Sequence, residues 1–253
     1  MKTLHVLLLV FLLMWCIAHC ESSAFSRPST EDIAEAYLGK PWVSHPLAES
    51  SPSGFDCTTY VEDVLAERYE NPKMVLNRIR YKDGGSGFFN RNHFMEEMWI
   101  PNALRHGFIA PIILAGTAES SMDVDLAEWY RSNPEIVIKD AAYYQQANAQ
   151  RRFTASIPYM PTAQINEPLL KRLPEEIVVF FLRRYPKTPY RWLLNDNAVM
   201  VTHMGFLFGG RRLYHASYEQ KQVVKEDFLG YLQAHRSVCG VAFYEITDIT
   251  FPP

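Results

Sequence analysis

The strongest constraint on the fold lies in the last third of the chain. Short runs of β-branched and aromatic residues alternate there with turn residues, at 176–181, 199–208, 212–217 and 238–246. This alternation is typical of a small antiparallel sheet, because such side chains pack well on a pleated surface. One helix is expected between the last two runs, at 225–232.

Two further helices are expected before this sheet. Ser29 followed by Asp32 fits the capping box of a short helix that ends at Gly39-Lys40-Pro41. Asp56 is a natural N-cap for a second helix from about residue 57 to residue 69, whose apolar side chains recur at helical spacing. A helix at the front and a sheet at the back predict an α+β fold, with the second helix packed on the sheet.

The middle of the chain, residues 78–172, has a different composition. It is rich in aromatic residues, Pro and Gly, and it contains no internal repeat or low-complexity tract. One helix is expected at about 140–151. We interpret the segment as a large insertion that wraps around the helix and sheet.

Length and charge restrict the class of protein. The chain has 253 residues, of which 48% are hydrophobic, which is enough to bury a sizeable core in one domain. Lys and Arg number 25 against 28 Asp and Glu, so the net charge is -3. Because no excess positive charge is available to follow a phosphate backbone, we expect no nucleic-acid partner.

The first twenty residues resemble an export signal. Lys2 precedes an apolar run at 6–17, and Ala18 and Cys20 form a candidate cleavage region. The run is short for a membrane span, although a retained N-terminal anchor is the alternative. His19 stands where a lipoprotein signal requires a small residue, so lipoprotein anchoring is less favoured. We therefore predict a signal peptide at 1–20, a mature domain at 21–253 and no stable membrane anchor.

The cysteines point to a single reactive thiol. The chain has 4 cysteines and no Cys-x-x-Cys pair, and export leaves Cys57 and Cys239 in the mature body. Cys57 is expected at a helix N-terminus, where the helix dipole favours the thiolate and so a nucleophile. The alternative is a small buried hydrophobic residue. Cys239 opens an apolar strand and is interpreted as inert core.

Two histidines lie in neighbouring strands around the turn Gly209-Gly210. A three-residue loop would place His203 and His215 on one face of the sheet, whereas a two-residue loop would place them on opposite faces. On one face, His203 is the candidate base for Cys57, and His215 would orient it. Metal binding is the rival interpretation, but Asp196 is the only nearby extra ligand in the sequence, so we expect no metal and no other cofactor.

Three segments together resemble the NlpC-type, papain-like cysteine hydrolases of bacterial cell walls. They are Ser51-Pro52-Ser53-Gly54-Phe55-Asp56-Cys57, Thr202-His203-Met204-Gly205-Phe206 and Tyr214-His215-Ala216-Ser217. The spacing between the two histidines also agrees with that family. The resemblance implies a papain-like fold in which an N-terminal helix carries the nucleophile, and a periplasmic location after export.

A closer branch is similar over most of the mature chain. The segments that carry this similarity are 56–62, 80–84, 90–94 and 157–159. They resemble the N-acetylmuramoyl-L-alanine amidase-like branch, formerly a domain of unknown function. This resemblance implies an enzyme that cuts the amide between the lactyl group of (anhydro)muramic acid and L-Ala in muropeptides, with Cys57 as nucleophile, His203 as base and His215 as third member. We expect the protein to be a monomer.

The same resemblance suggests residues that bind substrate and leaves alternatives open. The candidates are Trp42, Arg91, His93 and Tyr159, in loops or within 78–172, which is expected to line the cleft. Each can instead have a packing or solvated role. The sequence departs from the family pattern at Trp42, where a tyrosine is expected, and after Arg91, where a Tyr-Phe pair is missing. A γ-D-glutamyl-diamino acid endopeptidase and a catalytically silent wall-binding module remain alternative functions.

Overall fold

A computed structural model describes residues 28–44, 54–82, 85, 87, 90–132 and 152–248. The expected signal peptide at 1–20 and the helix expected at 140–151 lie outside the described residues. Within the described ranges, no helix is both long enough and apolar enough to cross a bilayer.

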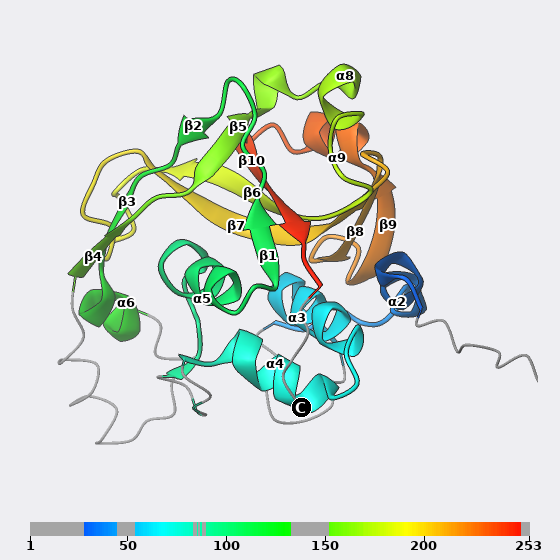
Figure 1. The fold of residues 1–253 in the computed structure, drawn as a ribbon. Coiled ribbons are helices and arrows are strands. Elements are labelled where there is room, and N and C mark those ends of the chain that lie inside the picture. Colours follow the sequence, from blue (N-terminus) through cyan, green and yellow to red (C-terminus); the bar gives the residue numbers. More distant parts are fainter. Residues whose placement is uncertain are drawn as a thin grey trace, which may run out of the picture.

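The fold is α+β and is built on one large antiparallel sheet (Figure 1). The sheet has 8 strands in the order β2-β5-β10-β6-β7-β8-β9, and β1 also pairs with β10. The strands are β1 Ile109–Pro111, β2 Ala118–Glu119, β5 Pro158–Pro161, β6 Glu176–Tyr185, β7 Ala198–Phe208, β8 Arg212–Ser217, β9 Gln222–Asp227 and β10 Val238–Ile246. A separate pair joins β3 Met122–Asp125 to β4 Arg152–Ala155.

The four expected strand runs are confirmed as β6, β7, β8 and β10, but the sheet is larger than the sequence indicated. The segment 78–172 adds β1, β2 and β5 to one side of it, through pairing of β1 and β5 with β10. This segment is therefore partly built into the sheet.

The helix expected at 225–232 begins later in the structure, at Phe228. Residues 222–227 form β9, in which Val223 and Val224 are buried and paired with β8. The helix α9 Phe228–Ala234 begins after Asp227, whose side chain accepts the Gly230 N–H at 2.8 Å. The acidic run before the helix resembles a first helical turn in sequence, but pairing with β8 keeps it extended.

The helices lie on both faces of the sheet (Figure 1). On one face α3 Cys57–Glu67 packs at the centre, with α2 Thr30–Ala36, α4 Pro72–Arg80 and α5 Ile100–Arg105 around it. On the other face lie α8 Glu167–Leu170 and α9. The other helices within the described ranges are the π-helix η3 Met95–Trp99, α6 Leu126–Ser132 and the 3-10 helix η4 Thr162–Gln164. The expected helices at the front are confirmed as α2 and α3.

Alternation along the strands divides the core between these two faces. Val178, Phe180 and Phe206 pack against α3, whereas Val179 and Phe181 face α9. A third apolar cluster lies around β3, β4 and α6.

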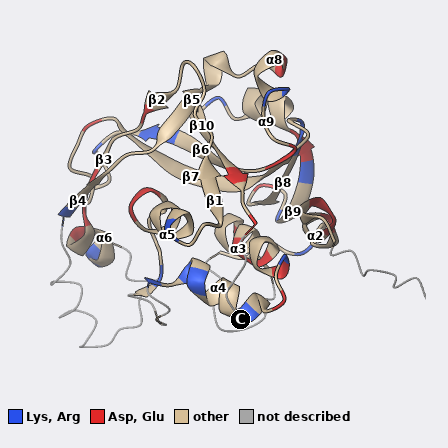
Figure 2. Ribbon diagram, viewed as in Figure 1, with Lys and Arg blue, Asp and Glu red and all other residues tan. Residues whose placement is uncertain are grey.

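Lys and Arg are interspersed with Asp and Glu over the helices and strands that Figure 2 shows.

Candidate functional site

The start of α3 fixes the position of Cys57. Asp56 is the N-cap, and it forms a capping box with Thr59: the Asp56 Oδ1 accepts the Thr59 N–H at 2.7 Å, and the Thr59 Oγ1 accepts the Asp56 N–H at 3.0 Å. The N-cap role expected for Asp56 is therefore confirmed. Cys57 follows as the first helical residue, is partly buried and is a free thiol.

The hairpin between β7 and β8 brings the two histidines together. Residues 209–211 form a three-residue loop, and both Gly209 and Gly210 have left-handed φ values, 57° and 63°. The register pairs Phe206 with Tyr214, so His203 and His215 share a face and lie diagonally across the two strands. His203 Nε2 lies 2.8 Å from His215 Nδ1. The odd-length loop required for a paired site is present.

Gly205 makes room for this pair. A Cβ at residue 205 would lie 2.6 Å from the Tyr214 carbonyl oxygen and 3.0 Å from the His215 Cβ. A larger residue at 205 would therefore push β7 away from the strand that carries His215.

A bulge in β7 sets the direction of His203. Phe181 lies opposite His203, but Leu182 lies opposite Val201, so Thr202 is the extra residue. The buried carboxyl group of Glu96, in η3, accepts the Val201 N–H. Beyond the bulge the His203 ring lies on the α9 face, with its centroid 5.6 Å from that of Phe181.

The chain of hydrogen bonds continues to Glu226, which the sequence motifs do not indicate. Glu226 Oε1 lies 2.9 Å from His215 Nε2, and Gln220 Nε2 donates to the same oxygen at 3.1 Å. The sequence of β9 resembles the start of a helix, and a helix there would not place Glu226 beside the histidines. The signal that could have found it is the alternation in 222–227, where Val224 and Glu226 share a face.

Cys57 and His203 open into the same cavity, of about 380 Å³. Three of the four proposed substrate-binding residues also line it, namely Trp42, Arg91 and His93. The other lining residues are Ser44, Asp56, Thr58, Asn92, Met95, Trp129, Thr202, Ala216 and Tyr218. Residues of the segment 78–172 thus form part of the cavity lining.

Aromatic and charged contacts hold these side chains in place. The Trp42 ring packs edge-on against Tyr218 at 4.9 Å, and Lys221 Nζ lies 3.4 Å from the Tyr218 ring centroid. The His93 ring lies 5.4 Å from Trp129. Tyr218 is exposed and was not anticipated from the sequence. An aromatic ring that is exposed at a cavity and held from behind is suited to contact a sugar or peptide face.

Arg91 is anchored by α3. Its Nη2 donates to Glu62 Oε2 at 3.1 Å, and Glu62 also accepts from Arg80 Nε at 2.7 Å. Both Glu62 and Arg80 are buried. Arg91 is therefore held against the helix that carries Cys57, in contrast to the solvated loop that was the alternative.

Tyr159 does not reach this cavity. It is buried in β5, where its ring packs against Gly240 of β10, and its backbone is paired with Ala118 of β2. The structure gives Tyr159 a packing role in the core.

The electrostatics leave both reacting groups neutral in the free protein. Burial, with the negative charge of Asp56 second, raises the pKa of the Cys57 thiol to about 12, and hydrogen bonds from the Met204 backbone and the Thr58 side chain oppose this rise. Burial, with nearby His215 second, holds the pKa of His203 well below its usual range. Loss of hydration thus outweighs the helix dipole, and the free thiolate expected from the helix position is not favoured.

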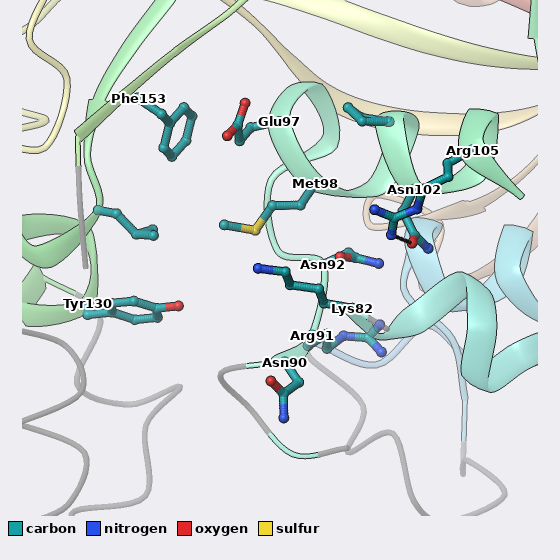
Figure 3. A pocket seen from close by; sticks show the side chains of 12 residues that line it. Lys82, Asn90, Arg91, Asn92, Glu97, Met98, Asn102, Arg105, Tyr130 and Phe153 are labelled. Atoms are coloured by element: carbon teal, nitrogen blue, oxygen red, sulfur yellow. Dashed lines mark hydrogen bonds between the residues drawn. The ribbon is translucent and has the colours of Figure 1, made fainter. Parts of the chain in front are cut away.

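A second cavity has a volume of about 270 Å³, and Figure 3 shows the side chains that line it. Arg91 and Asn92 line both cavities. The second also contains Lys82, Arg105 and a single acidic side chain among its lining residues, Glu97. In Figure 3, Lys82 extends across the space between Asn92, Met98 and Tyr130. Cationic groups therefore line a cavity that shares two residues with the cavity of Cys57.

Metal ligands are not gathered in the described part of the chain, where no group of three or more His, Cys, Asp or Glu side chains is arranged to hold an ion. Cys239 lies in β10, where its Sγ donates to the Leu182 carbonyl at 3.4 Å.

The AmiA-like family model, described as N-acetylmuramoyl-L-alanine amidase-like, matches residues 32–240. The chain belongs to this family. The matched range contains Cys57, both paired histidines and Glu226. Membership of the N-acetylmuramoyl-L-alanine amidase-like family indicates, at a coarse level, a hydrolase of the bacterial cell wall.

Solved structures show the same fold as this amidase-like chain. A crystal structure of a Legionella pneumophila protein of the same family is 19% identical with a TM-score of 0.73, over 87% of this chain and 88% of that one. An N-acetylmuramoyl-L-alanine amidase from Bacteroides uniformis is 22% identical with a TM-score of 0.63, over 87% and 98% of the two chains. No curated protein matches the chain significantly.

Proposed function

We propose that this chain is a cysteine-dependent amidase that hydrolyses the N-acetylmuramoyl-L-alanine amide of muropeptides, with an anhydromuramoyl end as the expected glycan. The family and the amidase structures of like fold support a cell-wall amidase. The cysteine mechanism is supported by one observation in particular. Cys57 and His203 line the same cavity, and His215 is hydrogen-bonded to the far side of the His203 ring.

The chemistry follows from the protonation states. In this proposal Cys57 loses its proton to His203 as its sulfur attacks the amide carbonyl carbon. His203 then gives this proton to the nitrogen of L-Ala, so that the C–N bond breaks and a muramoyl thioester remains. Water, deprotonated by His203, hydrolyses the thioester to a lactyl carboxylate and restores the thiol. The Cys57 backbone N–H at the helix start is the natural donor to the oxyanion.

The atom of His203 that acts as base can be assigned from its partners. Its Nε2 is occupied by His215. Nδ1 is therefore the ring nitrogen left for Cys57. This arrangement, a cysteine at a helix start and a histidine on the sheet, supports a papain-like mechanism of the NlpC type.

The decisive experiment is a digest of defined muropeptides, with and without the anhydro end, followed by mass spectrometry. The proposal predicts a free peptide that begins with L-Ala and an intact disaccharide. A product in which L-Ala and D-Glu stay on the sugar would instead identify the γ-D-glutamyl-diamino acid endopeptidase. Labelling of Cys57 by a thiol probe that substrate blocks, without any cleavage, would identify a silent wall-binding module.

We further propose that residues 1–20 direct export to the periplasm and that the mature protein acts there as a monomer without a membrane anchor. The apolar run after Lys2 supports the export step. N-terminal sequencing of the protein from the periplasmic fraction tests it, because a chain that begins at residue 1 would contradict removal of the signal.

A further inference from the structure

We propose that Glu226 is a positioning residue that fixes the tautomers of both histidines, so that His203 presents an unprotonated Nδ1 towards Cys57. This inference rests on the proposed function, because it assigns a role within the same site. Neither the sequence motifs nor the family description includes Glu226.

The assignment of the tautomers starts from the negative charge of Glu226. The hydrogen bond from His215 is the main cause that lowers the pKa of Glu226, so the carboxylate can only accept. His215 Nε2, at 2.9 Å, must therefore carry the proton. A neutral imidazole has one N–H, so His215 Nδ1 is the acceptor for His203 Nε2 at 2.8 Å. The remaining nitrogen of His203, Nδ1, is left as the base.

The sheet register builds this line of three side chains. Leu213 of β8 pairs with Glu226 of β9, so Glu226 lies on the face of Leu213 and His215, one diagonal step from His215. His215 is in turn one diagonal step from His203. Three adjacent strands therefore carry the three groups at the same stagger.

Neighbouring side chains shield His203 and His215 from solvent and orient Glu226. His215 is 2% exposed, and the Tyr231 ring packs against it at 5.2 Å and against His203 at 6.2 Å. Glu226 is only partly buried and keeps its charge. Gln220, which donates to the same Oε1 as His215, holds that oxygen towards the ring. A carboxylate in this position also stabilises the positive charge when His203 takes the proton from Cys57.

Two variants test the hydrogen-bond acceptor and the negative charge of Glu226 separately. E226A removes both, whereas E226Q keeps an acceptor, because Gln220 favours the amide oxygen at the same place. Glu219→Ala is the matched control, since Glu219 is a nearby exposed acid that pairs with His235 at 3.3 Å and does not line the cavity. The measurements are kcat and KM on muropeptide, their pH profiles, and ¹⁵N NMR of the histidine rings in the intact protein.

We expect E226A to lower kcat by about 10- to 100-fold with little change in KM. In E226A, the ¹⁵N signals of the His203 ring should show a mixture of tautomers. E226Q should keep the parent tautomers and recover part of kcat, while the acid limb of its pH profile moves to lower pH because the imidazolium loses its countercharge. The Glu219→Ala control should match the parent in all three measurements.

Unchanged ¹⁵N signals of His203 and His215 in E226A would overturn the proposal. Should E226A fail to fold, an unshifted pH profile in E226Q would overturn it equally. The NMR measurement needs no turnover, so it tests Glu226 even if the parent cleaves no muropeptide, which is the result that would overturn the proposed function alone.

Discussion

At the scale of single residues, the proposed reaction depends on one proton that moves between Cys57 and His203. We expect Cys57→Ala to abolish hydrolysis and His203→Ala to lower kcat by roughly 10²- to 10⁴-fold, because each step needs both groups. The double variant should be no worse than Cys57→Ala. Steady-state kinetics with circular dichroism as a folding control checks this, and near-parental rates in either single variant would exclude the cysteine mechanism.

His215 should behave differently, because it orients His203 and takes no proton from substrate. His215→Asn and His215→Gln keep an oxygen that can accept the His203 Nε2–H, so they should retain more activity than His215→Ala, which we expect to lose about 10- to 100-fold in kcat. The comparison needs the three variants side by side. Equal loss in all three would contradict an orienting role.

The neutral resting state has a measurable consequence. Because the pKa of Cys57 is raised to about 12, the thiolate fraction should grow about tenfold per pH unit through neutral and mildly alkaline pH. The alkylation rate of the free protein by iodoacetamide should therefore rise continuously over this range. A plateau of fast alkylation at neutral pH would show a thiolate and imidazolium pair instead.

Residue-scale prediction from sequence was best where chemistry and local structure coincide. Cys57 follows an N-cap, and a glycine turn precedes His215, so both could be placed from short-range patterns. Arg91 could not be interpreted fully, since its anchor on Glu62 is a long-range contact. Tyr159 lies in a strand that pairs with β10 far along the chain, and nothing local indicates its burial.

At the scale of elements, the strands of the last third were predictable because their alternation is regular. β9 was not, because its charged second half has the composition of a helix start. The bulge at Thr202 was also hidden, since a single extra residue leaves no mark on a short apolar run. Glu96, which accepts the Val201 N–H beside this bulge, lies in a π-helix, and helical spacing of apolar residues does not indicate such an element.

The contact between Glu96 and the bulge gives a prediction for stability. Near about pH 5, Glu96→Ala should lower the free energy of unfolding by about 1–3 kcal/mol, because it leaves the Val201 N–H without its acceptor. Glu96→Gln keeps an acceptor and should cost less. Urea unfolding of the parent and both variants measures this, and equal costs for Ala and Gln would contradict the role of the hydrogen bond.

The same experiment has a signed pH dependence. Burial raises the pKa of Glu96 to about 7 from 4.5, so between these values the unfolded chain releases this proton more readily than the folded one. The parent therefore loses stability through this group as pH rises across that window. Glu96→Gln lacks the titration, and its stability relative to the parent should increase from about pH 5 to about pH 8. A constant difference would contradict a buried, titrating Glu96.

At the scale of the whole molecule, the segment 78–172 turns a sheet and helix frame into a protein with two adjoining cavities. Its residues form one wall beside Cys57 and supply all the side chains that line the second cavity. The sequence indicated that the segment would reach the cleft, through the family resemblance. The second cavity itself could not be predicted, because it forms between side chains from several elements that are distant in sequence.

If a muropeptide binds with its amide at Cys57 and its peptide past Arg91, the peptide's carboxylates enter the cation-lined second cavity. Lys82→Ala should then raise KM by about 2- to 5-fold for a substrate with a full peptide, since a charge contact made by an exposed lysine contributes little more than that. The same variant should leave KM unchanged for a substrate that carries L-Ala alone. Lys73→Ala, an exposed α4 lysine that does not line either cavity, is the control. An equal rise for both substrates would place the peptide elsewhere and leave the second cavity unused by this reaction.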